Sequence, residues 1–279
     1  LALLSTAALN VYTQDGILDA IRTIETARAG QPRGSLSDIC LEIAFGRLEL
    51  RADGYAAATR ALTQAYHETE TPARAEVHAD AAIALSSAMR DVGDFQEALT
   101  LAHESIAWDD AHGDSEALSV ATYLQGEDLD AMRAPQAAIA AFERARAISV
   151  ALGDRQGVAF SDLGMCRSLI ELRRYQAARP RCRSAAQVFA ASHTTDMSKE
   201  TQTYLAEIDL HQGRARQALA TLDQVLEHGG ADTDPASASA AYLTRAQAHA
   251  ATHDYRRAYL DLQTYLQRYR AQNLARHLW

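Results

Sequence analysis

The sequence predicts an all-α fold, a right-handed α-solenoid (superhelix) built from antiparallel helix hairpins. First, alanine is abundant, while the 279 residues include only 14 glycines and 5 prolines, a composition that suits long helices and disfavours sheets. Second, apolar residues recur at helical spacing between short turns. Third, one pattern of residues repeats every 40 positions, and a fixed period of about 20–50 residues is the signature of stacked repeats.

The repeat appears in four registers that stay in phase. Alanine stands at positions 58, 98, 138, 178, 218 and 258. Three residues before each alanine an aromatic residue is commonest: Tyr55, Phe95, Pro135, Tyr175, Ala215 and Tyr255. Twelve residues before it stands a small residue: Gly46, Ser86, Gly126, Cys166, Ala206 and Ala246. Four residues after it stands an apolar residue: Leu62, Ala102, Phe142, Cys182, Leu222 and Leu262.

Each copy of the pattern predicts two helices joined by a tight turn. In the second copy, residues 77–92 show helical apolar spacing and end at Gly93-Asp94. Glycine tolerates the left-handed conformation that closes a helix, and aspartate caps the start of the next, which we expect over residues 95–110. The small residue allows the two helices of a hairpin to approach to about 8 Å.

The copies predict a single superhelical domain over residues 1–279. Asp15-Gly16 lines up with Asp53-Gly54 at a spacing of 38, which indicates a partial hairpin over residues 1–34. Six repeats follow, at about 35–72, 73–113, 114–153, 154–195, 196–233 and 234–279. The last repeat includes a long helix that reaches at least Arg270. Its four tyrosines indicate a cap or a stalk into a further domain, and we expect the chain to be a piece of a longer protein.

The order of small residue, Gly-Asp turn, aromatic residue, alanine and apolar residue resembles the tetratricopeptide repeat family. The resemblance covers nearly the whole chain. The usual period in that family is about 34 residues, and the 40-residue variety is similar to the repeats of kinesin light chain, helical cargo adaptors and bacterial signalling proteins. Pro135 and Ala215 depart from the aromatic position, while Arg214 and Arg173-Arg174 depart from the Gly-Asp turn.

The resemblance implies a non-catalytic module that binds a protein or peptide. The terminal helix is similar to the end of repeat sensor regions that precede diguanylate cyclase (GGDEF) or histidine kinase domains. The chain is accordingly expected to be the sensory or scaffolding region of a larger bacterial signal-transduction protein. Two alternatives stay open: a stand-alone adaptor that forms a homodimer through the C-terminal helix, and an enzyme of a type that carries no known motif.

The resemblance also places the ligand in a concave groove lined by the first helices of the hairpins. The residues expected there mix arginine, acids and a few apolar side chains, which suits an extended peptide held by side-chain clamps. They are Arg47, Asp80, Ile83, Ser87, Arg90, Tyr123, Glu127, Asp130, Phe160, Arg167, Thr203, Glu207 and Gln247. Cys40 faces the same groove.

Composition and motifs exclude several other functions. The net charge of −9 argues against nucleic-acid binding, which needs a basic face. The sequence has no GxSxG, HExxH, GxGxxG or glycine-rich phosphate loop, so neither an enzyme nor a cofactor is predicted. The longest apolar run, residues 1–9, is too short to span a bilayer. Cysteines that look free favour the cytoplasm, and the periplasm stays open.

Cysteine and histidine pairs are interpreted as structural. Cys166 and Cys182 stand in packing positions of the repeat and are predicted to be buried and inert. The odd number of cysteines, three, argues against a disulfide framework. His249 and His253 are predicted to be a solvated pair, not metal ligands, because no third ligand accompanies them.

Two charged stretches are predicted to be solvated helix faces, and a second interpretation of each stays open. One is acidic and would suit a basic partner: Glu127, Asp128 and Asp130. The other is basic and would suit an acidic partner or a phosphate: Arg173, Arg174, Arg179, Arg181 and Arg183.

Overall fold

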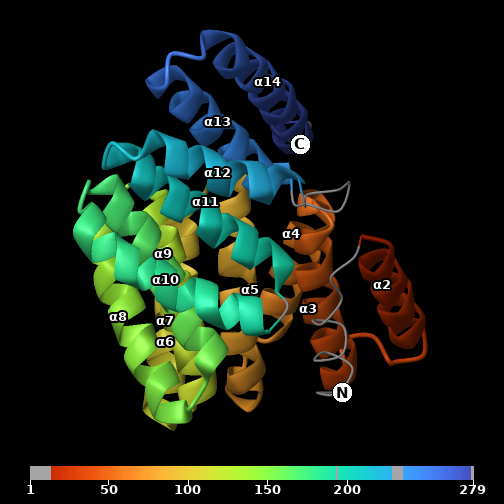
Figure 1. The fold of residues 1–279 in the computed structure, drawn as a ribbon. Coiled ribbons are helices and arrows are strands. Elements are labelled where there is room, and N and C mark those ends of the chain that lie inside the picture. Colours follow the sequence, from red (N-terminus) through yellow and green to blue (C-terminus); the bar gives the residue numbers. More distant parts are fainter. Residues whose placement is uncertain (1–13, 193, 228–234, 278–279) are drawn as a thin grey trace. The chain divides into compact units, whose positions relative to one another are not determined.

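The computed structural model describes residues 14–192, 194–227 and 235–277 (Figure 1). Over these residues the chain is helical and contains no strand. None of the described helices is both long and apolar enough to cross a membrane. The elements are α2 (Gln14–Ala29), α3 (Leu36–Arg51), α4 (Tyr55–Glu68), η1 (Pro72–Arg74), α5 (Ala75–Val92), α6 (Phe95–His112), α7 (Ser115–Ala131), α8 (Pro135–Leu152), α9 (Arg155–Glu171), α10 (Tyr175–Ala191), α11 (Thr195–His211), α12 (Ala215–Glu227), α13 (Pro235–Ala251) and α14 (Tyr255–His277).

The described helices group into two compact units, which divide between Arg133 and Ala134. In the first unit α3 pairs with α4 and α5 with α6, and in the second α9 pairs with α10, α11 with α12 and α13 with α14. Within each unit the second helix of a hairpin also packs against the first helix of the next one. The prediction of an all-α solenoid of helix hairpins is confirmed, while the assignment of residues 1–279 to one domain stays a prediction.

The Gly93-Asp94 turn has the geometry predicted for it. Gly93 ends α5 with φ of +91°, and the carboxylate of Asp94 accepts a hydrogen bond from the Glu97 N–H at 3.2 Å. This bond satisfies one of the free N–H groups at the start of α6. The helices predicted over 77–92 and 95–110 are α5 and α6, each two residues longer than predicted.

The small position of the repeat lies at the crossing of the two helices in a hairpin. In the first unit, a Cβ on Gly46 of α3 would lie 2.5 Å from Cγ of Leu62 on α4, and Leu62 is fully buried. A glycine also allows close approach between hairpins: a Cβ on Gly164 of α9, which is not the small position of its repeat, would lie 2.6 Å from the ring of Phe142 on α8, the helix before it in the chain. Glycine therefore lets the large residue fill the space between the helices.

Cys166 and Cys182 are fully buried, as predicted, but the structure joins them in a disulfide with the Cα atoms 5.4 Å apart. The expectation of unpaired thiols is therefore corrected. The small position of the first helix faces the apolar position of the second helix across the hairpin, and this brings the two cysteines to bonding distance. Cys40 is free and half-buried, and burial raises the pKa of its thiol, with Asp80 and Glu76 acting in the same direction.

The turn inside each hairpin places one residue in the left-handed conformation at the same 40-residue period. The residues and their φ angles are Asp53 (59°), Gly93 (91°), Arg133 (60°), Arg173 (57°), Gly213 (78°) and His253 (64°). A side chain at such an angle costs about 1 kcal/mol relative to glycine. The fold therefore imposes the turn geometry even where the sequence departs from glycine.

Replacing Arg173 by glycine is expected to raise the free energy of unfolding by about 0.5–1 kcal/mol, because it relieves the left-handed strain. Arg183 provides the matched control, since it is exposed inside α10. Arg183→Gly should lower the free energy of unfolding by about 1 kcal/mol. Urea denaturation measures both, and a loss of stability in Arg173→Gly would contradict the role of the turn.

Candidate functional site

Two neighbouring positions of the repeat on the first helices differ in exposure. Residues one position after the small residue are all at least partly exposed: Arg47, Ser87, Glu127, Arg167, Glu207 and Gln247. Residues three positions before the small residue are mostly buried: Ile43, Ile83, Leu163 and Thr203. The exposed surface of a first helix therefore includes the position after the small residue and mostly excludes the position three before it.

Two residues predicted to line the groove are instead buried within the chain. Ile83 is 6% exposed and belongs to a core cluster with Ala102, Ile106 and Ala121. Thr203 is 3% exposed, and its hydroxyl donates to the carbonyl of Lys199 at 3.0 Å. Both stand three positions before the small residue, on the side of the helix that packs against its neighbours, so neither belongs to an exposed face.

The other predicted residues retain some exposure, and their role in binding stays a prediction. In the first unit they are Arg47, Asp80, Ser87, Arg90, Tyr123, Glu127 and Asp130, and in the second Phe160, Arg167, Glu207 and Gln247. Sequence reasoning omitted Val120, which is 55% exposed, and Glu200, which is partly exposed. The 40-residue period identifies both, because they share the repeat position of Asp80 and Phe160.

Arg47 and Asp80 connect two first helices of the first unit. The guanidinium of Arg47 on α3 donates to the carboxylate of Asp80 on α5 at 2.5 Å and to the Asp80 carbonyl at 3.4 Å. The two side chains are 29% and 51% exposed. The pair therefore presents one cation and one anion to solvent in fixed positions, a suitable arrangement for holding the backbone or charged side chains of a peptide.

Arg90 and Asp128 form a second link between first helices of the same unit. Arg90 on α5 donates to Asp128 on α7 at 2.8 Å, and the hydroxyl of Ser86 donates to the other carboxylate oxygen at 3.0 Å. Asp128 is fully buried, which corrects its assignment to a solvated acidic face. Burial raises the pKa of Asp128 to about 6, against the opposing effect of Arg90. Arg90 keeps 18% of its side chain exposed and so still reaches the surface.

Asp109 of α6 is expected to make stability depend on pH. The residue is 2% exposed, and burial raises the pKa of its carboxyl to about 6 from an ordinary value of 3.8, although the Ser105 hydroxyl opposes the shift. The folded chain therefore binds the proton more tightly than the unfolded chain. The contribution to the free energy of unfolding is present below about pH 4 and is lost, by roughly 1–3 kcal/mol, as the pH rises to about 6.

Asp109→Asn should remove this part of the pH dependence in urea denaturation between about pH 4 and 6.5. The neighbouring residue Asp110 is exposed, so Asp110→Asn should leave the curve unchanged. An unchanged curve for Asp109→Asn would contradict the assignment.

In the second unit, an acid and an aromatic residue mark the exposed faces of the first helices. Glu207 on α11 is half-buried, and burial raises the pKa of its carboxyl. The His211 ring lies 3.8 Å from that carboxylate and stacks on Tyr175 with the centroids 4.8 Å apart. Phe160 on α9 meets Phe189 edge to face at 5.1 Å. These contacts hold Glu207 and Phe160 in defined positions at the surface.

Two arginines of α10, Arg179 and Arg181, bind acidic partners inside the chain, which corrects their assignment to a solvated face, while Arg173, Arg174 and Arg183 are exposed as predicted. Arg181, together with Arg146 of α8, donates to Asp162 of α9, each at 2.9 Å. Arg179 donates to Asp209 of α11 at 2.6 Å. Asp162 and Asp209 are 0% and 4% exposed. These arginines therefore fasten neighbouring helices together.

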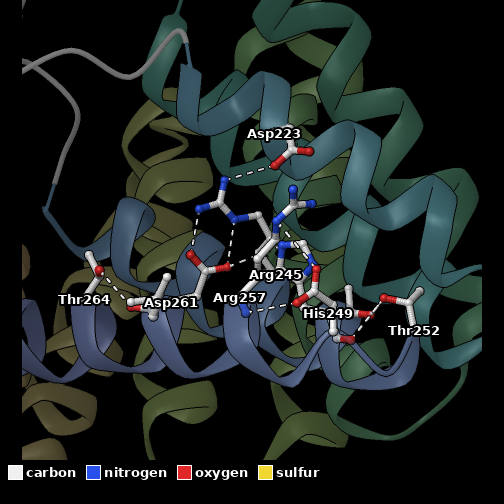
Figure 2. Close-up of polar contacts among 10 residues, drawn as sticks. Asp223, Arg245, His249, Thr252, Arg257, Asp261 and Thr264 are labelled. Atoms are coloured by element: carbon white, nitrogen blue, oxygen red, sulfur yellow. Dashed lines mark hydrogen bonds and ion pairs between the residues drawn. The ribbon is translucent and has the colours of Figure 1, made fainter.

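A third charged cluster joins the last three helices (Figure 2). Arg245 of α13 binds both carboxylate oxygens of Asp261 on α14, at 2.9 and 2.7 Å, and Asp223 of α12 at 3.0 Å. His249 is 6% exposed, and its ring lies 3.9 Å from Asp261. The prediction of a solvated histidine is therefore wrong for His249, while His253 is exposed. The cluster is a structural clamp because its charges bind one another.

The described residues offer no group of three or more metal-ligating side chains. One arrangement has the order of a catalytic triad: Thr69 lies 2.9 Å from Nδ1 of His78, whose Nε2 lies 2.9 Å from Glu104. Thr69, however, is fully buried and lies 2.8 Å from the carbonyl oxygens of Ala65 and Tyr66. Its hydroxyl cannot reach a substrate, so the arrangement joins α4, α5 and α6 and is not a nucleophilic site.

No protein-family model matches the chain, and comparison with characterised proteins finds no relative by sequence. Solved structures are nevertheless similar in fold. A Rap protein complexed with Competence and Sporulation Factor aligns with a TM-score of 0.66 and 12% identity over 92% of this chain and 81% of its own. A STAND protein with a tetratricopeptide repeat sensor, from Pyrococcus horikoshii, aligns with a TM-score of 0.66 and 16% identity over 91% of this chain and 39% of its own. A tetratricopeptide repeat protein from Parabacteroides merdae aligns with a TM-score of 0.58 and 14% identity over 94% of this chain and 90% of its own.

The chain therefore has the fold of tetratricopeptide repeat proteins, as its sequence predicts. At these identities the similarity establishes the arrangement of helices and not the ligand.

Proposed function

We propose that this protein is a non-catalytic repeat module that binds a protein or peptide on the first helices of its hairpins. The observation that carries the proposal is the row of partly exposed side chains one position after the small residue. The row changes character from one helix to the next: Arg47, Ser87 and Glu127 in one unit, and Arg167, Glu207 and Gln247 in the other. A row of this kind suits an extended partner that is contacted by several different side chains, and does not suit a small ligand held in one enclosed pocket.

The ion pairs beneath the row support this proposal. Arg47 and Asp80 hold each other between α3 and α5, and Arg90 is held by the buried Asp128. A side chain that is already fixed loses less conformational entropy when a ligand arrives, which favours binding. Exposed charges of both signs also favour one orientation of a bound peptide over the reverse, because the charges of the peptide must lie opposite charges of the other sign on the protein.

We further propose that the module is the sensory or scaffolding part of a bacterial signalling protein. Two similar structures support this context: one Rap protein is complexed with Competence and Sporulation Factor, and the repeat of the STAND protein is a sensor. A stand-alone adaptor that dimerises through α14 is the alternative. Light scattering over a range of concentrations separates the two, because the adaptor would be a dimer. The disulfide between Cys166 and Cys182 removes the argument for the cytoplasm from free cysteines, because disulfides are typical of oxidising compartments such as the periplasm.

Selection of peptides from a displayed random library against the whole chain tests the proposal. Selected peptides should bind in calorimetry, and Arg47→Glu should weaken their binding at least about tenfold, since truncation or reversal of a charged contact costs about 1.4 kcal/mol or more. Arg183→Glu is the matched control, because Arg183 is an exposed arginine of α10, a second helix. Equal affinities of the two variants would overturn the assignment to first helices.

A further inference from the structure

One side of α14 carries a continuous row of exposed apolar residues. Tyr255 is 65% exposed, Tyr259 61%, Leu262 40%, Leu266 47% and Tyr269 48%. The intervals between them are 4, 3, 4 and 3 residues, the alternating spacing with which one helix packs along another. A row of this length is unusual on a free surface, where large apolar side chains are normally scattered.

The repeat shows that this face is built to be covered. Leu262 stands four residues after the repeat alanine, where the earlier hairpins have Leu62, Ala102, Phe142, Cys182 and Leu222, each 0% exposed. Tyr269 stands at the position of Thr69, Asp109, Ser149 and Phe189, each at most 2% exposed. In those hairpins the first helix of the next hairpin packs on the second helix. Among the described helices, none packs on α14 in this way.

The charges beside the row indicate the chemistry of its partner. Arg256 and Arg270 are exposed on α14, each one residue after a tyrosine of the row. Arg257 pairs instead with Asp254 at 3.5 Å, and Arg268 lies over the ring of Tyr242 on α13. The acidic residue in that segment, Asp261, is buried and bound to Arg245. Arg256 and Arg270 therefore give the described edge of the apolar row a positive charge, in a protein whose net charge is −9. Two copies that paired along this row would bring like charges together, whereas an acidic helix would complement them.

We propose that α14 is a docking surface for an amphipathic helix with acidic flanks, which packs on the Tyr255–Tyr269 row as the first helix of a following hairpin would. The partner presents small and apolar residues to Leu262 and Leu266, and places glutamate or aspartate opposite Arg256 and Arg270. This surface is separate from the first-helix faces proposed to bind a peptide, so each proposal stands without the other.

The test uses two synthetic helical peptides, each about three heptads long, with leucine and alanine at the a and d positions. The Glu peptide carries glutamate at e and g, and the Lys peptide carries lysine there, so neither pairs with itself. Binding to the full 279-residue chain is followed by fluorescence anisotropy. The Glu peptide should bind at least about tenfold more tightly than the Lys peptide at about 0.05 M salt, and the difference should shrink at about 0.5 M.

Two sets of variants separate the apolar row from its charges. Leu262→Ser with Leu266→Ser should weaken binding of the Glu peptide at least about tenfold, while Val150→Ser, at an exposed valine of α8, should not. Arg256→Glu with Arg270→Glu should reverse the preference toward the Lys peptide, while Arg183→Glu should leave it unchanged. Because all these residues are exposed, circular dichroism should show the same melting temperature for each variant.

Three results would overturn the proposal. Equal binding of both peptides would show that charge does not select the partner. Binding that is indifferent to Leu262→Ser with Leu266→Ser would place the site elsewhere. A dimer in light scattering that the same double substitution dissociates would assign the row to a second copy of this chain.

Discussion

Asp162→Ala is expected to lower the free energy of unfolding by about 3 kcal/mol. Asp162 is fully buried in α9 and accepts hydrogen bonds from Arg146 and Arg181 at 2.9 Å and from the Ser184 hydroxyl at 2.7 Å. Removing it leaves two neighbouring guanidinium groups, each 34% exposed, without their counter-charge. Their partial exposure keeps the loss below that of a fully buried pair.

Two controls separate the loss of a buried charge partner from the loss of any carboxylate. Asp19→Ala should cost less than about 0.5 kcal/mol, because Asp19 and its partner Arg22 are 75% and 72% exposed. Asp162→Leu combined with Arg146→Met and Arg181→Met should recover most of the lost stability, since apolar residues of similar size replace the whole cluster. Urea denaturation measures all of these. A triple variant less stable than Asp162→Ala would contradict the account.

Phe142→Ala is expected to cost about 3–5 kcal/mol. Phe142 is among the largest fully buried side chains of the chain, and its ring lies against Gly164 of α9, where a Cβ would be 2.6 Å away. Truncation removes the apolar contact and leaves a cavity at the helix crossing.

Thermal or urea unfolding can also test how closely Phe142 and Gly164 fit together. Gly164→Ala alone should cost about 1–3 kcal/mol by overpacking, and Phe142→Leu alone about 1–2 kcal/mol by underpacking. The double variant should lose less than the sum, because the smaller leucine leaves room for the new methyl group. Strict additivity of the two costs would contradict direct contact between the two positions.

The helix hairpins could be predicted from sequence because their signals are local and repeated. The turn at Gly93-Asp94 and the small residue at Gly46 each specify one contact of the fold, and the 40-residue period copies that contact along the chain. Even the irregular turn at Arg173 adopts the same left-handed geometry. Six copies in phase outweigh a weak signal in any one of them, so the fold survives substitutions that would obscure a single hairpin.

The charged pairs could not be predicted in the same way, because they join residues far apart in the sequence and occur once each. Asp128 looked like part of a solvated acidic run, yet its partner Arg90 lies 38 positions earlier. Arg181 was predicted to be solvated, yet it donates a hydrogen bond to Asp162 on the neighbouring helix α9. The disulfide between Cys166 and Cys182 could not be predicted from the period alone, because the period gives each cysteine its position on its own helix and not the distance between the two across the hairpin.

Hydrogen–deuterium exchange with a library-selected peptide tests the central claim most directly. We expect the peptide to slow exchange in first helices of at least one unit, α3, α5 and α7 or α9, α11 and α13, because the partly exposed row lies on them. Exchange in the second helices α4, α6, α10 and α12 should change little. Protection confined to second helices, or none at a saturating peptide concentration, would contradict a ligand site on the first-helix faces.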